Sequence, residues 1–364
     1  MKILPGIKKR WRLAAIWVRQ HKKISIITGC TLLAVVAGGI SLAVSYQSPV
    51  RNIGNIPLTK PQAPKPAVVR YYSPLTGEPV TDEAAIKKPV TAVMIENSPD
   101  ARPQSGLADA EVVYEAIAEG GITRFLAMYQ NNKPGLVGPV RSLRMYYVDW
   151  LKPYDASVAH VGGSYFALQE IRNGNYRDID QFFNSGTYWR ADDRYAPHNV
   201  YTNFEKLDVL NASKGYTTSN PTGIARADSA ASKTPNATSI AIDISSPTYN
   251  SSYIYEAASN TYLRSQAGAP HNDREKGQIR TRVVVVIKTD MNAVMQDGIR
   301  EDYRTTGTGE AHIFQDGVVK KATWHKQDRD HQMFFTGEDG KELPLARGTT
   351  WITAVDANGG VSWQ

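Results

Sequence analysis

Two carboxylates and an arginine are the clearest candidates for chemistry in this sequence. Glu115 and Glu119 precede Gly120-Gly121, and Arg124 follows it, within two runs that alternate apolar and polar residues. Two glycines between alternating runs predict a tight β-hairpin. In a regular register both carboxylates lie on one face with Arg124 between them, because opposed and diagonal residues share a face. Glu115 and Glu119 are therefore catalytic candidates, and Arg124 is a ligand-binding candidate.

The spacing of the two carboxylates restricts what they could catalyse. Four residues along a strand span roughly 13 Å. The carboxyl pair of a glycosidase lies about 5 Å apart in retaining enzymes and at most about 9.5 Å apart in inverting ones. A third acid, Glu96 or Asp180, would have to complete such a pair. The alternative interpretation is that Glu115 and Glu119 form the solvated face of an edge hairpin.

More arginines and a histidine follow in two polar stretches. Arg141 and Arg144 lie at the start of a predicted helix over 145–152, where basic side chains oppose the helix dipole. This placement indicates that they contact an anion, which is either an internal carboxylate or a ligand. The densest polar stretch, residues 189–201, reads WRADDRYAPHNVY and supplies three further candidates: Arg190, His198 and Asn199.

Several alternatives for His198 stay open. It could bind a metal ion together with His160 and one of the aspartates in 189–201, or form a triad with Ser164 and Asp180. No pair has the spacing of a known zinc motif, and no Gly-x-Ser-x-Gly sequence occurs. We therefore predict neither a metal nor a cofactor. The simplest alternative is a loop held together by internal Arg–Asp pairs.

The N-terminal part of the chain predicts a membrane anchor and a spacer. Residues 24–44 contain no charged side chain, and a helix of that length spans about 30 Å, the thickness of a hydrocarbon core. Eight basic residues and no acid lie in 1–23, so we expect a cytoplasmic tail, one transmembrane helix and an external remainder in a bacterial cell membrane. A cleaved signal peptide and lipidation at Cys30 are the alternatives. Residues 45–70 hold five prolines and predict an extended linker.

The charge of the chain comes from the predicted cytoplasmic tail. The formal net charge is +7, with 42 basic and 35 acidic residues. Without the eight basic residues of the tail, 34 basic residues face 35 acidic ones, so the external part is close to neutral. A basic surface for nucleic acid is therefore not predicted.

Strand and helix patterns predict an α+β fold in two domains, preceded by the one transmembrane helix. Residues 71–225 combine buried-strand runs with short helices and form a mixed α/β N-terminal domain. Residues 226–250 are a connecting segment. Residues 251–364 form a small β-rich C-terminal domain, in which Asp316-Gly317 is a hairpin turn.

Several short motifs follow one another in a fixed order: Ser73-Pro74-Leu75-Thr76-Gly77, Ile95-Glu96-Asn97, Arg102-Pro103-Gln104-Ser105-Gly106-Leu107, Tyr114-Glu115, Glu119-Gly120-Gly121-Ile122-Thr123-Arg124, Gly138-Pro139-Val140-Arg141-Ser142 and Ala196-Pro197-His198-Asn199. Together they resemble the bacterial YerB-like lipoprotein family of unknown function, over most of residues 72–364. The resemblance implies an envelope-tethered, two-domain extracytoplasmic protein without an established activity. Family members often carry a lipobox where this chain has the predicted membrane span. The resemblance also implies that eight polar residues matter to the family, and Glu96 and Arg102 are ligand-binding candidates on that ground: Glu96, Arg102, Glu115, Glu119, Arg124, Arg141, Arg144 and His198.

Three functions follow from these candidates. The first is a membrane-anchored extracytoplasmic protein of the cell envelope that binds an anionic wall-associated ligand through an Arg/Glu/His cleft. The second is a hydrolase of a cell-wall polymer, with Glu115 or Glu119 and His198 as acid and base. The third is a scaffold for wall-synthesis enzymes, in which the charges are structural. The expected partners are the cytoplasmic membrane and either a wall polymer or wall-synthesis enzymes, and no nucleic acid.

Overall fold

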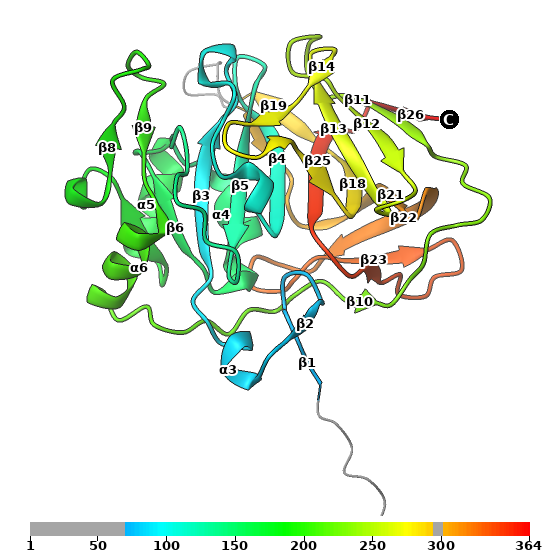
Figure 1. Ribbon diagram of the computed structural model, residues 1–364, viewed down its shortest axis with the longest axis horizontal. Coiled ribbons are helices and arrows are strands. Elements are labelled where there is room, and N and C mark those ends of the chain that lie inside the picture. The colour runs from blue at the N-terminus through cyan, green and yellow to red at the C-terminus, as the bar shows by residue number, and fades with distance from the viewer. Residues whose placement is uncertain (1–69, 294–300) are drawn as a thin grey trace, which may run out of the picture. The chain divides into compact units, whose positions relative to one another are not determined.

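A computed structural model describes residues 70–293 and 301–364 (Figure 1). This part of the chain consists mostly of β-structure, with few helices. Within these ranges, no helix has the length and apolar character that a membrane crossing requires. The predicted tail 1–23, the predicted span 24–44 and all but the last residue of the predicted linker lie outside the described residues.

A ten-stranded mixed sheet forms the centre of the fold. Its strands, in spatial order, are β23 (Phe334–Gly337), β22 (Val318–Lys326), β21 (Gly307–Gln315), β18 (Val283–Thr289), β25 (Thr350–Asp356), β4 (Val112–Glu119), β5 (Ile122–Tyr129), β3 (Thr91–Glu96), β6 (Ser157–His160) and β7 (Arg177–Asp180). The predicted regions 71–225 and 251–364 each contribute five adjacent strands. They meet where β25 pairs in parallel with β4, with Thr350 opposite Val112. The predicted hairpin turn at Asp316-Gly317 joins β21 to β22 and is confirmed.

A second sheet and four helices pack against the central sheet within the described residues. The second sheet contains β14 (Ala269–Pro270), β13 (Thr261–Gln266), β12 (Ser251–Glu256), β11 (Ser239–Asp243) and β26 (Gly360–Trp363), with β17 (Arg280–Thr281) paired to β13. The α-helices of the described residues are α3 (Glu83–Ile86), α4 (Met145–Leu151), α5 (Tyr165–Asn173) and α6 (Phe204–Ser213). The helix predicted over 145–152 is thus α4. In Figure 1, α5 and α6 lie near β6 at the left, and the yellow strands β13 and β14 lie near β25 and β18 at the right.

Short elements complete the described part. The two-stranded pairs are β1 (Tyr71–Tyr72) with β2 (Pro79–Val80), β8 (Trp189–Arg190) with β9 (Val200–Tyr201), β10 (Arg226–Ala227) with β24 (Leu345–Ala346), β15 (Asn272–Asp273) with β16 (Gly277–Gln278), and β19 (Met291–Ala293) with β20 (Glu301–Tyr303). Single 3₁₀ turns lie at Pro99–Ala101, Leu107–Asp109, Lys152–Tyr154 and Ser185–Thr187. Both β10 and β11 fall in the predicted connecting segment 226–250.

The hairpin β4–β5 forms as predicted, but its register is not regular. Glu119 lies opposite Ile122 as expected, and a bulge then shifts the pairing, so that Glu115 lies opposite Phe125 and Arg124 opposite Ala116. One extra residue in a strand moves every later side chain to the other face. Glu115 therefore lies on the opposite face of the sheet from Glu119 and Arg124. The prediction of one face that carries all three charges is wrong.

The two faces of the hairpin pack against different layers. On the Arg124 face, the hydroxyl of Tyr147 from α4 donates to the carbonyl of Arg124 at 2.6 Å. On the Glu115 face, Arg264 from β13 donates to the Glu115 carboxylate at 3.0 Å. Helix α4 thus covers the Arg124 face and the second sheet covers the Glu115 face, where α6 also packs, since its Phe204 contacts Tyr129. Polar residues of the hairpin are divided between these two interfaces.

Candidate functional site

A short segment separates the ends of two parallel strands in the central sheet. β3 and β6 pair directly only over the first three residues of β3. Beyond them residues 139–143 lie between the strands, because the Arg141 amide donates to the Met94 carbonyl at 2.8 Å and the Arg141 carbonyl accepts from the Val161 amide at 3.0 Å. Open α/β sheets place ligands at the carboxyl ends of their strands. This edge presents side chains from β3, from the inserted segment and from the loop after β6.

Glu96 ends β3 and is the centre of a polar cluster at this edge. Its Oε1 accepts from the Ser98 hydroxyl at 3.0 Å, lies 2.9 Å from Nδ1 of His198, and lies 3.2 Å from Nε of Arg141. Glu96 is 2% exposed, and its Oε2 makes no hydrogen bond with the residues that the structure describes. A buried carboxylate oxygen without a donor is unfavourable and calls for an explanation. We name these four residues, Glu96, Ser98, Arg141 and His198, the edge cluster.

Arg141 and His198 bring the edge cluster to the surface. Both side chains are 22% exposed. The terminal nitrogens of Arg141 donate no hydrogen bond to any described residue, and Nε2 of His198 lies 3.9 Å from the exposed carboxylate of Asp100. The cluster can therefore offer a guanidinium with two free donor nitrogens, and an imidazole, to an incoming group.

Arg124 and Arg144 do not reach the surface, and both pair internally with the single carboxylate of Glu119. One carboxylate oxygen accepts from Arg124 at 3.1 Å and the other pairs with Arg144. Burial alone would raise the pKa of Glu119, but the two arginines hold that pKa below its usual value. Arg124 also donates to the carbonyl of Ser142 at 2.9 Å, within the inserted segment. For Arg144 the anion expected from the sequence is thus an internal carboxylate.

Glu115 lies in a different environment, fully buried between the two sheets. Nη2 of Arg264 donates to both of its oxygens, at 3.1 and 3.0 Å, and the indole of Trp351 donates at 2.9 Å. The Arg264 guanidinium lies 4.3 Å from the Trp351 ring centroid, in a cation–π arrangement. Glu115 contacts neither Arg124 nor solvent. Its geometry is that of a buried structural ion pair.

The buried network around Arg264 extends to a histidine. Nδ1 of His271 accepts from Nε of Arg264 at 2.9 Å, and its Nε2 lies 3.0 Å from Oε1 of Gln104. An arginine can only donate, so the imidazole is neutral with its proton on Nε2. Burial, followed by the charges of Arg264 and Arg102, holds the pKa of His271 well below its usual value.

Because the folded protein keeps His271 neutral, we expect its free energy of unfolding to fall at mildly acidic pH. Below about pH 6.5 the unfolded chain binds a proton at His271 that the folded chain does not bind, so the free energy of unfolding falls as the pH falls, by up to about 1.4 kcal/mol per pH unit. Urea unfolding at pH 7.5, 6.5 and 5.5 measures this slope. His271→Gln should lower the slope between pH 6.5 and 5.5 by about one bound proton. An unchanged slope in the variant would contradict the assignment.

Three other predicted binding residues hold the loops around the edge cluster. Arg102 faces the second-sheet side, where it donates to the side chain and the carbonyl of Asn97 and lies 5.3 Å from the Tyr249 ring. Arg190 donates to Oδ1 of Asn199 at 2.7 Å. Asn199 in turn donates to two carbonyls of its own loop, those of Ala191 and Arg194. These contacts position His198 and leave Arg102 apart from it.

The alternatives for His198 find no geometric support. His160 lies 2.8 Å from the Gly162 carbonyl and 3.0 Å from Asp178, and Asp180 pairs with Arg172 at 3.0 Å. Neither contacts His198. Within residues 70–293 and 301–364, no group of three or more His, Cys, Asp or Glu side chains is placed to hold a metal ion.

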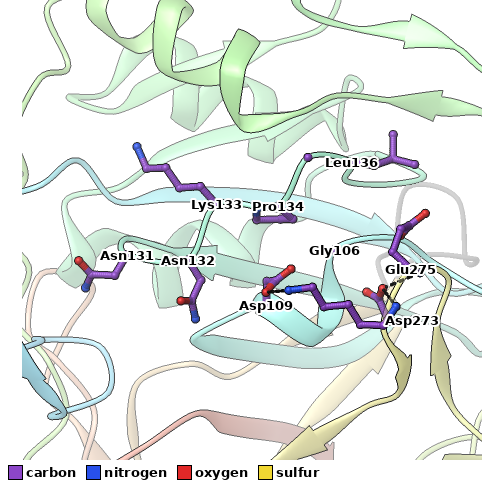
Figure 2. A pocket seen from close by; sticks show the side chains of 11 residues that line it. Gly106, Asp109, Asn131, Asn132, Lys133, Pro134, Leu136, Asp273 and Glu275 are labelled. Carbon is purple, nitrogen blue, oxygen red and sulfur yellow. Dashed lines mark hydrogen bonds and ion pairs between the residues drawn. The ribbon is translucent and has the colours of Figure 1, made fainter.

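A polar cavity of about 470 Å³ lies elsewhere, at the boundary of the two predicted regions (Figure 2). It is lined by Gly106, Asp109, Asn131, Asn132, Lys133, Pro134, Gly135, Leu136, Asp273, Glu275 and Lys276. Figure 2 shows Asn131 and Asn132 on one side and Asp273 and Glu275 on the other. Three carboxylates and two lysines line it, of which Lys276 pairs with Asp109 at 2.5 Å and Lys133 pairs with Asp208, outside the lining, at 2.6 Å. None of the predicted site residues lines this cavity, and its charge does not favour an anion.

Sequence reasoning missed Arg264, the partner of Glu115. Residues 261–266 alternate between partly buried and buried positions, and the buried ones are Tyr262, Arg264 and Gln266. An arginine in phase with a buried tyrosine is the signal that could have identified it. Ser98 was missed as well, although it lies two residues after Glu96.

Comparisons with known proteins identify the relatives of this chain. Residues 75–217 and 240–352 match the family models described as the N-terminal and C-terminal domains of "Protein of unknown function (DUF3048)", which gives a two-domain architecture. The chain is 33% identical over 291 residues to the Bacillus subtilis (strain 168) protein described as "Putative lipoprotein YerB", across 79% of this chain and 86% of that protein. The crystal structure of YerB from Bacillus subtilis superposes with a TM-score of 0.71 at 32% identity, covering 80% of this chain and 99% of that one. The chain belongs to the DUF3048 family, and the YerB-like resemblance of its ordered motifs is confirmed.

Proposed function

We propose that this chain is an extracytoplasmic protein of the bacterial envelope that binds an anionic, wall-associated ligand at the edge cluster. The charges on the Arg124 face of the central sheet, which α4 covers, support the proposal. Three arginines, Arg124, Arg141 and Arg144, face two carboxylates, Glu96 and Glu119, so this group of ionised side chains carries one excess positive charge. Arg141 is the partly exposed arginine of the three, and no described residue accepts a hydrogen bond from its terminal nitrogens. A bidentate contact with a phosphate or carboxylate suits such a guanidinium.

Two observations support the envelope location. The relative in Bacillus subtilis is described as a lipoprotein. The sequence of 1–70 has a basic segment, an uncharged run and a proline-rich stretch, which together are typical of a membrane tether. Both the transmembrane form and the lipidated form would leave residues 71–364 outside the cytoplasmic membrane.

Arg141→Gln should weaken binding of an anionic wall polymer about tenfold or more, because a charged hydrogen bond contributes on the order of 1.5–3 kcal/mol. The measurement is retention of the full-length protein, in mild detergent, on wall fragments that carry phosphate polymers. The matched control is Arg280→Gln, which removes the same charge from a half-exposed arginine of the second sheet that pairs with Glu256. Equal retention of the two variants would contradict the proposal.

A hydrolase is the second candidate, favoured by the pair of Glu96 and His198. A carboxylate 2.9 Å from Nδ1 orients the imidazole and leaves Nε2 directed toward the exposed Asp100, an arrangement that general bases use. The acid in this pair is Glu96, whereas the sequence favoured Glu115 or Glu119. A change in the mass of bound wall fragments, abolished by His198→Gln with retention preserved, would distinguish hydrolysis from binding.

A further inference from the structure

Four aromatic side chains are exposed at the same edge of the central sheet as the edge cluster. Tyr165 and Phe166 begin α5, and Phe182 and Phe183 lie two and three residues after the end of β7. Their exposed fractions lie between 50% and 69%. The rings of Tyr165 and Phe166 contact each other, with centroids 5.4 Å apart, and Phe182 lies against Gly162, three residues before Tyr165. Large exposed rings near one another on a surface mark a place where a partner binds. We name these four residues the aromatic edge.

The aromatic edge adjoins the edge cluster through two backbone contacts. The ring of Phe182 lies against Gly162, where a β-carbon would be only 3.1 Å from it. The carbonyl of Gly162 accepts from the amide of Leu143, and the amide of Val161 donates to the carbonyl of Arg141, both at 3.0 Å. Because Arg141 and Leu143 belong to the inserted segment, Phe182 and the Arg141 guanidinium flank the same short stretch of chain.

The rings after β7 are held in place by polar contacts. The carboxylate of Asp180 accepts from the amides of Gly162 and Phe182, at 3.0 and 3.2 Å. Arg172 pairs with Asp180 at 3.0 Å and lies 5.0 Å from the ring centroid of Phe183. A fixed ring loses little conformational freedom when a ligand stacks on it, so these rings form a prepared platform.

The composition of this platform indicates the class of ligand. All four members are aromatic, and the exposed large aliphatic residues Val209 and Ile254 lie on α6 and β12 instead. Residues 160–184 hold three acids and two arginines, so they offer no attraction to an anionic lipid surface. Aromatic faces pack against the C–H faces of pyranose rings and leave the sugar hydroxyls in water, whereas membrane and protein contacts draw on aliphatic side chains as well.

We propose that the aromatic edge stacks sugar rings, so that the ligand is a pyranose glycan whose acidic groups contact Arg141. This inference rests on the proposed function for the acidic groups, but the stacking itself does not require them. The two parts can therefore be tested separately, with one glycan in two forms.

The experiment measures retention of the full-length protein, in mild detergent, on wall glycan strands with and without their phosphate polymers. Phe182→Ala and Tyr165→Ala should each weaken retention on both forms about three- to tenfold. Arg141→Gln should weaken retention only on the phosphate-bearing form. Phe334→Ala removes an exposed ring of β23, far along the sheet order from β7, and serves as the matched control without effect.

The outcomes distinguish the two proposals. The stacking inference is overturned if the ring variants are retained on both glycan forms as well as the wild type is. It is also overturned if not even the wild-type protein is retained on stripped strands. In either case, weaker retention of Arg141→Gln on the phosphate-bearing form would still support the proposed function. Binding to phosphatidylglycerol vesicles that depends on Phe182, without binding to stripped strands, would also overturn it in favour of a membrane contact. Dependence on Phe182 and Tyr165 with no effect of Arg141→Gln would support stacking and overturn the anionic site.

Discussion

Glu115→Ala should lower the free energy of unfolding by about 3–5 kcal/mol, because it leaves the charge of Arg264 buried without a counterion. Both side chains are fully buried, and the carboxylate accepts four hydrogen bonds, from Arg264 twice, from Trp351 and from Thr123. Removal of the carboxylate thus strands three donors that have no access to water. Chemical denaturation of the full-length protein in mild detergent measures the difference.

A matched control distinguishes burial from the mere loss of an ion pair. Glu256→Ala also removes a glutamate that pairs with an arginine of the second sheet, at 2.8 Å, but both partners are at least 39% exposed. Exposed pairs contribute little, so this variant should change stability far less. The double variant Glu115→Leu/Arg264→Met should regain much of the loss, since a buried ion pair can be replaced by apolar side chains. A similar loss in Glu115→Ala and Glu256→Ala would show that Glu115 is solvated in the protein.

The hairpin shows how far local sequence signals reach. Gly120-Gly121 between alternating runs predicts the turn, and the turn forms. The bulge beside it has no comparable signal, because Ala118 fits either a regular strand or a bulge. One unpredicted residue then reverses the face of Glu115 and separates it from Arg124. The strand positions are predicted well, but the error in register places Glu115 on the wrong face and so predicts a charged cluster that does not exist.

Contacts between distant segments explain most of what the sequence did not reveal. Arg264 lies 149 residues from Glu115 in the chain. The parallel pairing of β25 with β4, which joins the two halves of the central sheet, likewise connects distant parts of the sequence. No periodicity encodes such a pairing. The edge cluster was closer to prediction, since Glu96, Arg141 and His198 were all candidates by motif. What the sequence could not supply was the insertion of 139–143 beside β3, which brings the three together and excludes Arg124, Arg144 and Arg102.

Glu119→Gln should lower the free energy of unfolding by about 2–3 kcal/mol at pH 7, because it leaves two arginines with a neutral partner. The side chains of Arg124 and Arg144 are 1% and 4% exposed, whereas that of Glu119 is 28% exposed, so water offsets part of the loss. The pKa of Glu119 lies below its usual value. Its contribution to stability is therefore complete above about pH 4.3 and is lost as the pH falls through the lower, folded-state pKa.

The pH dependence separates this structural role from a catalytic one. The difference in unfolding free energy between wild type and Glu119→Gln should stay constant from pH 7 to pH 5 and shrink only at more acidic pH. Glu83→Gln removes a carboxylate whose partner, Lys87, is exposed, and should leave the unfolding curve nearly unchanged. A catalytic acid would behave differently: its glutamine variant would unfold like the wild type and lose only turnover. Both guanidinium groups that Glu119 binds are buried. Replacement of Glu119 must therefore disturb the packing of α4 on the Arg124 face before it can affect any reaction at the edge cluster.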